Sequence, residues 1–417
     1  MKQKIFRFIA DLRFSIFLLL LISILSIIGT IIEQDKSIEV YKMNYPLTNP
    51  VFGFLTWDRI MKFRLDHVYE TWWFFAIIFL FGLSLISCTF LQQLPSLKVS
   101  RRCQFFRTTK QFSRLKTFTK LTNFSLNMVL MRIRINQYSI FQQKNILYCY
   151  KGLTGRIAPI LVHFSIILIL TGTIIGSLLG FKAQEIVPKT ENFHVQNLLN
   201  SGQLAVIPKT SMRINDFWIT YTNKQTISQF YSDISILDFK GNEIKRKTIS
   251  VNYPLVNDNI YYYQTDWNLT GLRFESNDNS FSEYPLLNLD KVWLTWISND
   301  SSLYNGFIIT IDNLQGYCSI YNEVGEFLGN IEWHEKIDSN YTLALSDIIS
   351  STGLQIKADP GIYIIYIGFF LLMISTLISY ITYSQIWLIK KNQKLFIGGT
   401  TSRALFDFEL EFFKFIK

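Results

Sequence analysis

The hydropathy pattern of the chain separates four long apolar runs from two polar regions. No charged residue occurs in residues 14–32, 71–91, 157–180 or 361–389. A helix rises about 1.5 Å per residue, so roughly 20 apolar residues cross a bilayer. We therefore predict an integral membrane α-helical protein with four spans. The first run is longer than the core of a signal peptide and is predicted to be an uncleaved anchor, and the last is long enough to tilt or project.

The distribution of charge predicts which regions share one side of the membrane. Residues 92–156 contain 13 Lys and Arg residues and no acidic residue, and the N-terminal arm and the tail are also rich in Lys and Arg. Residues 181–360 contain 21 acidic and 13 basic residues. Because basic loops stay inside, the basic regions are predicted inside and the acidic region outside. The net charge of +10 therefore reflects membrane topology and does not indicate nucleic-acid binding.

These patterns predict eight consecutive segments. They are an inner arm with span 1 (1–32), an outer loop (33–70), span 2 (71–91), a basic inner domain (92–156), span 3 (157–180), a large outer domain (181–360), span 4 (361–389) and an inner tail (390–417).

The outer domain is predicted to be β-rich. Short runs of aromatic and β-branched residues alternate there with Asn, Asp, Gly and Ser, which is typical of a sandwich or an open barrel. The one helix-like feature expected in it is a short turn near 343–350. In the inner domain, residues 128–135 (MVLMRIRI) and 139–152 also have the composition of strands. Its basic groups predict either an anionic partner, such as lipid headgroups or haem propionates, or a topology signal on a small folded domain.

The four cysteines do not form a redox or metal motif. They are Cys88, Cys103, Cys149 and Cys318, and no Cys-x-x-Cys occurs. With one cysteine in the outer domain, an intrachain disulfide there is excluded, as are a dithiol reductase acting alone and a structural zinc site. Cys318 is interpreted as a buried strand thiol, with a transient mixed disulfide as the alternative.

His163 lies inside the third apolar run, where an ionisable residue is a functional-site hypothesis by default. On an ideal helix it points away from Gly172, Gly176 and Gly180, whose four-residue spacing predicts a close-packing face. Three roles stay open from the residues: an axial haem ligand, a proton relay, and a hydrogen bond to a neighbouring helix.

The other histidines carry weaker signals. His67 lies just before the second run and is a weaker candidate ligand at the outer interface. His194 and His334 lie in the outer domain without neighbouring metal ligands, so we expect solvated surface side chains.

Several motifs lie outside these runs. The pattern N-x-P-L…Y-Q-x-x-W is carried by Asn252, Pro254, Leu255, Tyr263, Gln264 and Trp267, and T-G-L-Q-I-K-x-D-P-G occupies 352–361 with Gly353, Asp359, Pro360 and Gly361. L-D-H-V-Y-x-T-W-W opens the second run, H-x-S…G-x-x-x-G marks the third, and a Gly-rich segment of the tail starts at 398. By these motifs the chain resembles, over essentially its whole length, the ResB/CcsB family of System II cytochrome c biogenesis proteins in its plastid form.

The resemblance implies a subunit that works with the haem-handling membrane protein CcsA. Together they would carry haem across the membrane and support its covalent attachment to apocytochromes c, with this chain as a non-catalytic or co-catalytic subunit of the haem-ligation complex. Haem would be a transient cofactor shared with CcsA, and His163 matches the transmembrane histidine implicated in binding it. The alternative function is a scaffold that stabilises CcsA and receives apocytochrome without binding haem.

The resemblance also implies further partners and a location. The apocytochromes would include cytochrome f and a soluble c-type cytochrome, and a thioredoxin-like thiol reductant is a further expected partner. Trp293 and Trp296 do not provide the tryptophan-rich signature of CcsA, so the chain resembles the ResB-like half and not a fusion. We expect a multi-pass protein of the plastid thylakoid with its large domain in the lumen, plastid-encoded because no transit peptide precedes the first run. The alternative is a bacterial plasma membrane.

Overall fold

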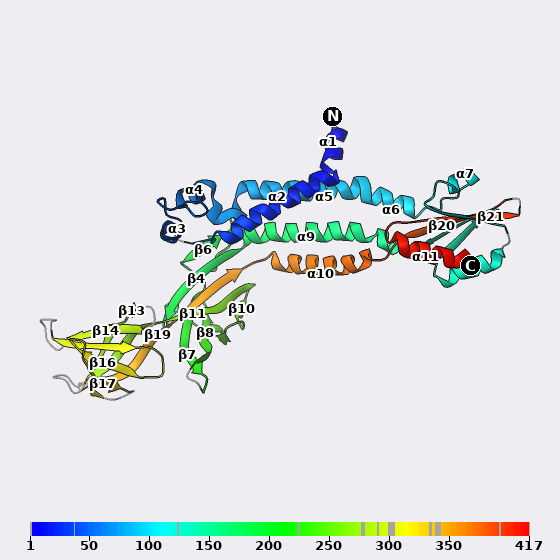
Figure 1. Cartoon of the computed structure of the whole chain (residues 1–417). Coiled ribbons are helices and arrows are strands. Elements are labelled where there is room, and N and C mark those ends of the chain that lie inside the picture. Colours follow the sequence, from blue (N-terminus) through cyan, green and yellow to red (C-terminus); the bar gives the residue numbers. More distant parts are fainter. Residues whose placement is uncertain are drawn as a thin grey trace. The chain divides into compact units, whose positions relative to one another are not determined.

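The computed structural model describes residues 2–36, 38–122, 125–223, 226–276, 280–289, 292–298, 305–332, 336–337, 343–391 and 393–416 (Figure 1). The chain forms two compact units. The first joins both ends of the chain, residues 1–174 and 361–417, and the second comprises residues 175–360.

Four helices in the described residues are long and apolar enough to cross a membrane. They are α2 (Leu12–Ile31), the continuous helix Trp72–Ser100, α9 (Ala158–Leu179) and α10 (Ile362–Ser379). Four candidate membrane helices are thus confirmed, but the predicted end of the fourth at residue 389 is wrong. Residues 384–389 belong to strand β20 (Ser384–Lys391), and because they are largely buried they are as free of charge as a membrane helix.

The second long helix changes its hydrogen-bond pattern part-way along. α5 (Trp72–Cys88) passes through one π-helical turn, η2 (Thr89–Gln93), into α6 (Leu94–Ser100). Pro95, just inside α6, has no N–H to complete an α-helical ladder. The π turn accommodates this gap, and turns of this kind often accompany functional sites.

The predicted loop 33–70 is largely helical. It contains α3 (Ile38–Asn44), α4 (Trp57–Phe63) and the 3₁₀ helix η1 (Leu65–Glu70), and a further short helix, α1 (Lys2–Ile9), precedes α2. Buried side chains of this region form a cluster of their own that includes Ile32, Tyr41 and Ile60.

A small domain of the first unit combines segments from both sides of the second unit. Its five-stranded sheet has the order β1-β21-β20-β3-β2, and every pairing in it is antiparallel. The bounds are β1 (Thr117–Leu121), β2 (Ser139–Gln143), β3 (Ile146–Lys151), β20, and β21 (Lys394–Thr401), with helices α7 (Thr109–Phe112), α8 (Leu126–Ile135) and α11 (Leu405–Ile416). The basic segment and the tail, predicted as separate segments, therefore share one core.

The strands expected in the basic segment are half correct. Residues 139–152 form the hairpin of β2 and β3 as predicted. Residues 128–135 lie in helix α8, so the strand interpretation of MVLMRIRI is wrong. Val129 and Ile133 are buried one turn apart, and this helical spacing decides the structure despite the β-branched composition.

The second unit is built from strands, which confirms the β-rich prediction. β11 (Ile260–Ser276) and β19 (Leu343–Ala358) pair along a seven-stranded sheet, so the turn expected near 343–350 is wrong. One half of this sheet packs on a four-stranded sheet and the other half on a five-stranded sheet, which makes two cores. The remaining strands are β4 (Phe181–Pro188), β5 (Asn192–Phe193), β6 (Leu198–Ser201), β7 (Ser211–Tyr221), β8 (Ile227–Leu237), β9 (Glu243–Ser250), β10 (Leu255–Asn257), β12 (Phe281–Pro285), β13 (Leu287–Leu289), β14 (Val292–Ser298), β15 (Gly306–Ile311), β16 (Cys318–Asn322), β17 (Phe327–Ile331) and β18 (Lys336–Ile337).

Candidate functional site

His163 on α9 forms a hydrogen bond with the π turn of the second long helix. Its Nδ1 lies 2.9 Å from Oγ1 of Thr89, the first residue of η2. The same hydroxyl lies 2.8 Å from the carbonyl oxygen of Leu85, to which it donates. The imidazole is half-buried. Of the roles left open by the sequence, a hydrogen bond to a neighbouring helix is therefore present.

This pair of hydrogen bonds favours a proton on Nδ1 of His163. A threonine hydroxyl has one hydrogen, and here that hydrogen is donated to Leu85. Thr89 must then accept from His163, so Nδ1 is protonated. In a neutral imidazole with Nδ1–H, Nε2 keeps its lone pair. This is the form in which protein histidines bind metals, with the second ring nitrogen donating to a fixed acceptor.

The opposite face of α9 packs against α10, as the glycine spacing predicts. A side chain at Gly172 would lie 2.7 Å from Ile365 and 3.0 Å from the carbonyl oxygen of Gly361. Gly368 of α10 approaches Ile169 just as closely. The small residues therefore bring these two helices together, which leaves His163 on the face toward α5.

Two apolar grooves lie along α5, and neither His163 nor Thr89 lines them. One, of 150 Å³, lies between α5 and α9 and is lined by Gly82, Ile86, Ile167 and other apolar side chains. A second, of 370 Å³, lies between α1 and α5 and contains Arg7. Ile86 and Leu83 line both, so the two grooves adjoin each other along α5. Both grooves are lined mainly by apolar side chains, and Arg7 is the charged residue of the larger one.

His67, the weaker candidate, is held by carboxylates at both ring nitrogens. Nδ1 lies 2.7 Å from Asp66 and Nε2 lies 3.4 Å from Asp35. Binding of iron at Nε2 would displace Asp35. Asp66 is itself buried, and its second oxygen has no hydrogen-bond partner in the described part of the chain.

Of the remaining histidines, His194 is the one that the structure describes. His194 is exposed and its Nε2 lies 3.0 Å from the side-chain amide of Gln196. His334 lies outside the described residues. Among the residues that the structure describes, no three His, Cys, Asp or Glu side chains are grouped so that they could hold a metal ion.

Gln264 of the N-x-P-L…Y-Q-x-x-W motif joins three strands inside the second unit. Its side-chain oxygen accepts from Ser232 of β8 and, at 2.7 Å, from Thr352 of β19, while its amide donates to the carbonyl of Asp266 at 2.7 Å. All three hydroxyl and amide side chains are buried. This fully satisfied network gives Gln264 a structural role.

The other residues of this motif lie in the same unit. Asn252 adopts the left-handed backbone conformation in the turn before β10, Leu255 is buried and Tyr263 stacks on Tyr261. The hydrogen bond between Gln264 of the first motif and Thr352 of the second brings the two motifs together in one sheet, although the residues are 88 positions apart in the sequence.

A bulge in the β11–β19 pair borders a polar pocket of 360 Å³. Gly353 pairs with Asp266 there, and a side chain at Gly353 would lie only 2.6 Å from the Cβ of Asp266. Trp267 and Trp293 also line the pocket, with ring centroids 5.3 Å apart, and the Trp293 indole donates to Asn268 at 2.6 Å. Asp359, Pro360 and Gly361 form the predicted turn before α10.

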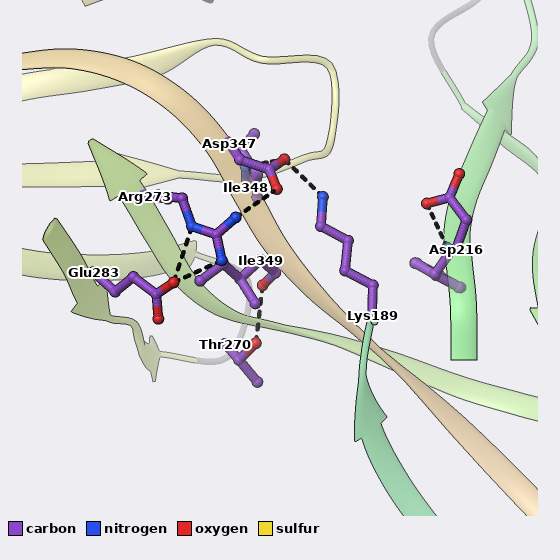
Figure 2. Close-up of polar contacts among 9 residues, drawn as sticks. Lys189, Asp216, Thr270, Arg273, Glu283, Asp347, Ile348 and Ile349 are labelled. Carbon is purple, nitrogen blue, oxygen red and sulfur yellow. Dashed lines mark hydrogen bonds and ion pairs between the residues drawn. The ribbon is translucent and has the colours of Figure 1, made fainter. Parts of the chain in front are cut away.

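A network of charged side chains links strands in the half of this sheet that packs on the five-stranded sheet. Figure 2 shows Asp347 between Lys189, 2.6 Å away, and Arg273, 3.9 Å away. Arg273 also donates through Nε and Nη2 to one oxygen of Glu283. Alternating charges thus connect β4, β11, β12 and β19 around a partly buried carboxylate.

The cysteines lie apart from one another. Cys88, Cys149 and Cys318 are buried and Cys103 is exposed, and all four are free thiols. Burial, with a smaller contribution from Asp312, raises the pKa of Cys318 to about 12, and burial raises that of Cys149 to about 12. Cys318 is therefore the buried strand thiol that the sequence suggested.

The sequence predicted His163 but not Thr89. Their positions differ by 74 residues, and a threonine at the end of an apolar run carries no signal of its own. The one local signal for this site is Pro95, which follows the apolar run 71–91 and interrupts the helical hydrogen bonds there.

Comparisons with known proteins place the chain in a family. A model of the ResB-like family matches residues 12–290 and 319–413. The chain is 74% identical to cytochrome c biogenesis protein Ccs1 of Phaeodactylum tricornutum and 65% identical to that of Thalassiosira pseudonana, in both cases over the full length of both chains. It is 41% identical to cytochrome c biogenesis protein CcsB of a Picosynechococcus strain, over 98% of this chain and 90% of that one. The chain belongs to the ResB-like family.

Proposed function

We propose that this protein is a membrane subunit for cytochrome c biogenesis that delivers haem across the membrane and supports its attachment to apocytochromes c. Relatives with identities of 41% to 74% over nearly the whole chain are named for cytochrome c biogenesis. The observation that carries the haem-binding part is the Thr89–His163 hydrogen bond, because it leaves Nε2 of a half-buried imidazole with a free lone pair for iron.

The apolar surface of α5 and the basic segment beside it in the chain support an amphipathic ligand. The apolar grooves along α5 suit the porphyrin, and the basic segment 92–156 suits its propionates. Haem is the cargo here, so its binding must be reversible. One protein ligand and one ligand from another chain would allow transfer.

We propose a CcsA-type haem-handling membrane protein as the source of the second axial ligand. Both ring nitrogens of His67 face carboxylates, so this histidine is a poor second ligand. The β-rich unit would lie in the thylakoid lumen, where apocytochromes such as cytochrome f, a soluble c-type cytochrome and a thioredoxin-like reductant would meet the haem.

The test is the haem content and absorption spectrum of the protein purified together with its CcsA-type partner. His163→Ala should lower the haem carried by the complex by about tenfold and change its Soret band, while both subunits remain. His194→Ala, which changes an exposed histidine, is the matched control and should leave both unchanged.

Unchanged haem in the His163→Ala complex would contradict the ligand role. It would instead favour a scaffold that stabilises the partner and receives apocytochrome without touching haem.

A further inference from the structure

Arg156 lies seven residues before His163, at the basic end of the same helical segment. It ends the 3₁₀ helix η3 (Leu153–Arg156), which leads into α9. His163 contacts Thr89 and Arg156 contacts Ser96, and these two partners lie seven residues, or about 10 Å, apart along the continuous helix Trp72–Ser100, so both side chains face that helix. The distance is comparable to the reach from a haem iron to its propionate carboxylates.

The guanidinium of Arg156 is held in place without a carboxylate. It lies over the ring of Tyr383, 5.0 Å from the centroid, and Nη1 lies 3.4 Å from the hydroxyl of Ser96. Its buried Nε has no hydrogen-bond partner, and no ion pair of Arg156 occurs in the described part of the chain. A guanidinium has five N–H donors, so most of its capacity for binding an anion remains.

Tyr383 is itself fixed, which makes the position of Arg156 well defined. Its hydroxyl donates to the carbonyl of Ser100 at 2.9 Å and lies 3.2 Å from the hydroxyl of Tyr148. Gln385 donates to Tyr148 at 2.6 Å and completes the chain of hydrogen bonds. Burial raises the pKa of Tyr383, so its hydroxyl stays a donor.

The local sequence supplies no internal counterion. Residues 92–156 contain no Asp or Glu, so an arginine with an unpartnered, buried Nε stands in an entirely basic segment. A partly buried cation of this kind is stabilised by an anion from outside the chain.

We infer that Arg156 binds a propionate carboxylate of the haem whose iron is bound by His163. This inference rests on the proposed function and adds an orientation to it. The haem plane lies along α9, with the propionate edge toward the basic end of the helix and the iron two turns further along. Arg156 and His163 together then select a metalloporphyrin with free carboxylates.

The experiment compares haem with haem dimethyl ester, which keeps the iron and loses both carboxylate charges. Binding of each is titrated by absorbance on the full-length protein in detergent. Arg156→Gln should weaken haem binding by about tenfold and change ester binding by less than twofold. His163→Ala should weaken both by a similar factor. Arg101→Gln, which removes an exposed cation of the same segment, is the matched control and should change neither.

A second variant distinguishes loss of the guanidinium group from misfolding of the protein. Arg156→Lys keeps the charge and loses the planar fork, so it should fall between wild type and Arg156→Gln for haem and match wild type for the ester. Equal weakening of haem and ester by Arg156→Gln would show a structural role and overturn the inference.

Other results distinguish failure of the propionate site from failure of the proposed function on which it rests. Unchanged haem affinity in Arg156→Gln, together with a loss in His163→Ala, would overturn the propionate site and leave the proposed function standing. A loss of binding to phosphatidylglycerol vesicles, with haem affinity unchanged, would assign the anion to a lipid phosphate instead. If His163→Ala affects neither porphyrin, the ligand role itself fails.

Discussion

At the scale of single residues, one hydroxyl group decides what His163 offers to a ligand. Thr89 donates to Leu85 and therefore accepts from the imidazole. The acceptor belongs to a π turn, where the backbone is displaced from the α-helical path. A substitution of Thr89 should thus alter ligand binding by His163 although His163 itself is unchanged.

Thr89→Val should impair haem binding through the imidazole. The substitution keeps the shape of the side chain and removes the hydroxyl that Nδ1 contacts, and the loss of this hydrogen bond costs about 1 kcal/mol of stability. Without that partner the tautomer is no longer fixed, so haem affinity should fall by about tenfold. Absorbance titration measures this fall.

Thr89→Ser is the control for this prediction. It retains the hydroxyl and should bind haem like the wild type. Equal affinity of the valine and serine variants would show that the hydrogen bond is unimportant.

The thiols differ in reactivity because the thiolate is the reactive form. With pKa values raised to about 12, Cys149 and Cys318 are protonated at pH 8, whereas Cys103 is exposed. Iodoacetamide at pH 8 should therefore label Cys103 in the folded protein, and Cys149 and Cys318 only after denaturation. Peptide mass spectrometry distinguishes the sites. Rapid labelling of Cys318 in the native protein would revive its alternative role in a mixed disulfide.

At this scale, the sequence identifies a chemically unusual residue such as His163 but not the residues that it contacts. His163 stands out because it is an ionisable residue in an apolar run. Thr89 and Arg156 gain their meaning from contacts across the fold, with His163 and Tyr383, which no local pattern encodes.

At the scale of elements, the approach of α9 and α10 depends on Gly172. A Cβ there would lie within 3.0 Å of both Ile365 and the carbonyl of Gly361. Gly172→Leu should therefore separate the helices and destabilise the protein by about 3 kcal/mol or more. The measurement is thermal unfolding in detergent, followed by size-exclusion chromatography.

Gly82 provides the matched control for this substitution. It also lies in a membrane helix, but the nearest atom to an added Cβ is 3.9 Å away on Leu170. Gly82→Ala should leave the unfolding temperature within a few degrees of wild type. A similar fall in unfolding temperature for both variants would mean that close packing between α9 and α10 does not explain the effect at Gly172.

The network around Asp347 should contribute to the stability of the long β11–β19 pair. Asp347→Ala removes a carboxylate that is 25% exposed and leaves Lys189, 20% exposed, without its counterion. We expect a loss of about 1 to 3 kcal/mol in the free energy of unfolding, measured by urea and tryptophan fluorescence on the full chain.

Glu283→Gln serves as the comparison. Glu283 is 56% exposed, so its ion pair with Arg273 should contribute no more than about 1 kcal/mol. A larger effect at Glu283 than at Asp347 would contradict the expected dependence on burial.

Three elements show where hydropathy alone misleads. In residues 126–135 the helical spacing of buried positions is present, but the Val and Ile content suggests a strand. In residues 384–389 a buried strand follows a membrane helix with no charge between them. Residues 343–350 form a strand because β11 lies beside them, and such pairing across the fold is not visible locally.

At the scale of the whole molecule, the small domain constrains the membrane topology. β3 and β20 are hydrogen-bonded neighbours, yet both α9 and α10 lie between them in the chain. Strands of one sheet must share one side of a membrane, so the chain crosses it an even number of times between them. This agrees with the orientation predicted from charge.

Cysteine labelling tests that orientation. In a Cys103→Ser background, cysteines placed at Lys144 and Lys391, both exposed, should react with a membrane-impermeant maleimide from the same side. A cysteine at Lys240, in the acidic β-rich unit, should react from the opposite side. Labelling of Lys144 and Lys391 from opposite sides would be incompatible with the sheet.

The same sheet has a consequence for biosynthesis. β1 pairs with β21 alone, and β3 receives its second neighbour, β20, only after roughly 230 further residues have been made. Until β20 and β21 have been made, β1 stays unpaired and the β2–β3 hairpin keeps an open edge, which is a target for proteases and aggregation. The small domain can therefore close only after β20 and β21 have been made, so a chain that stops before them exposes these strand edges.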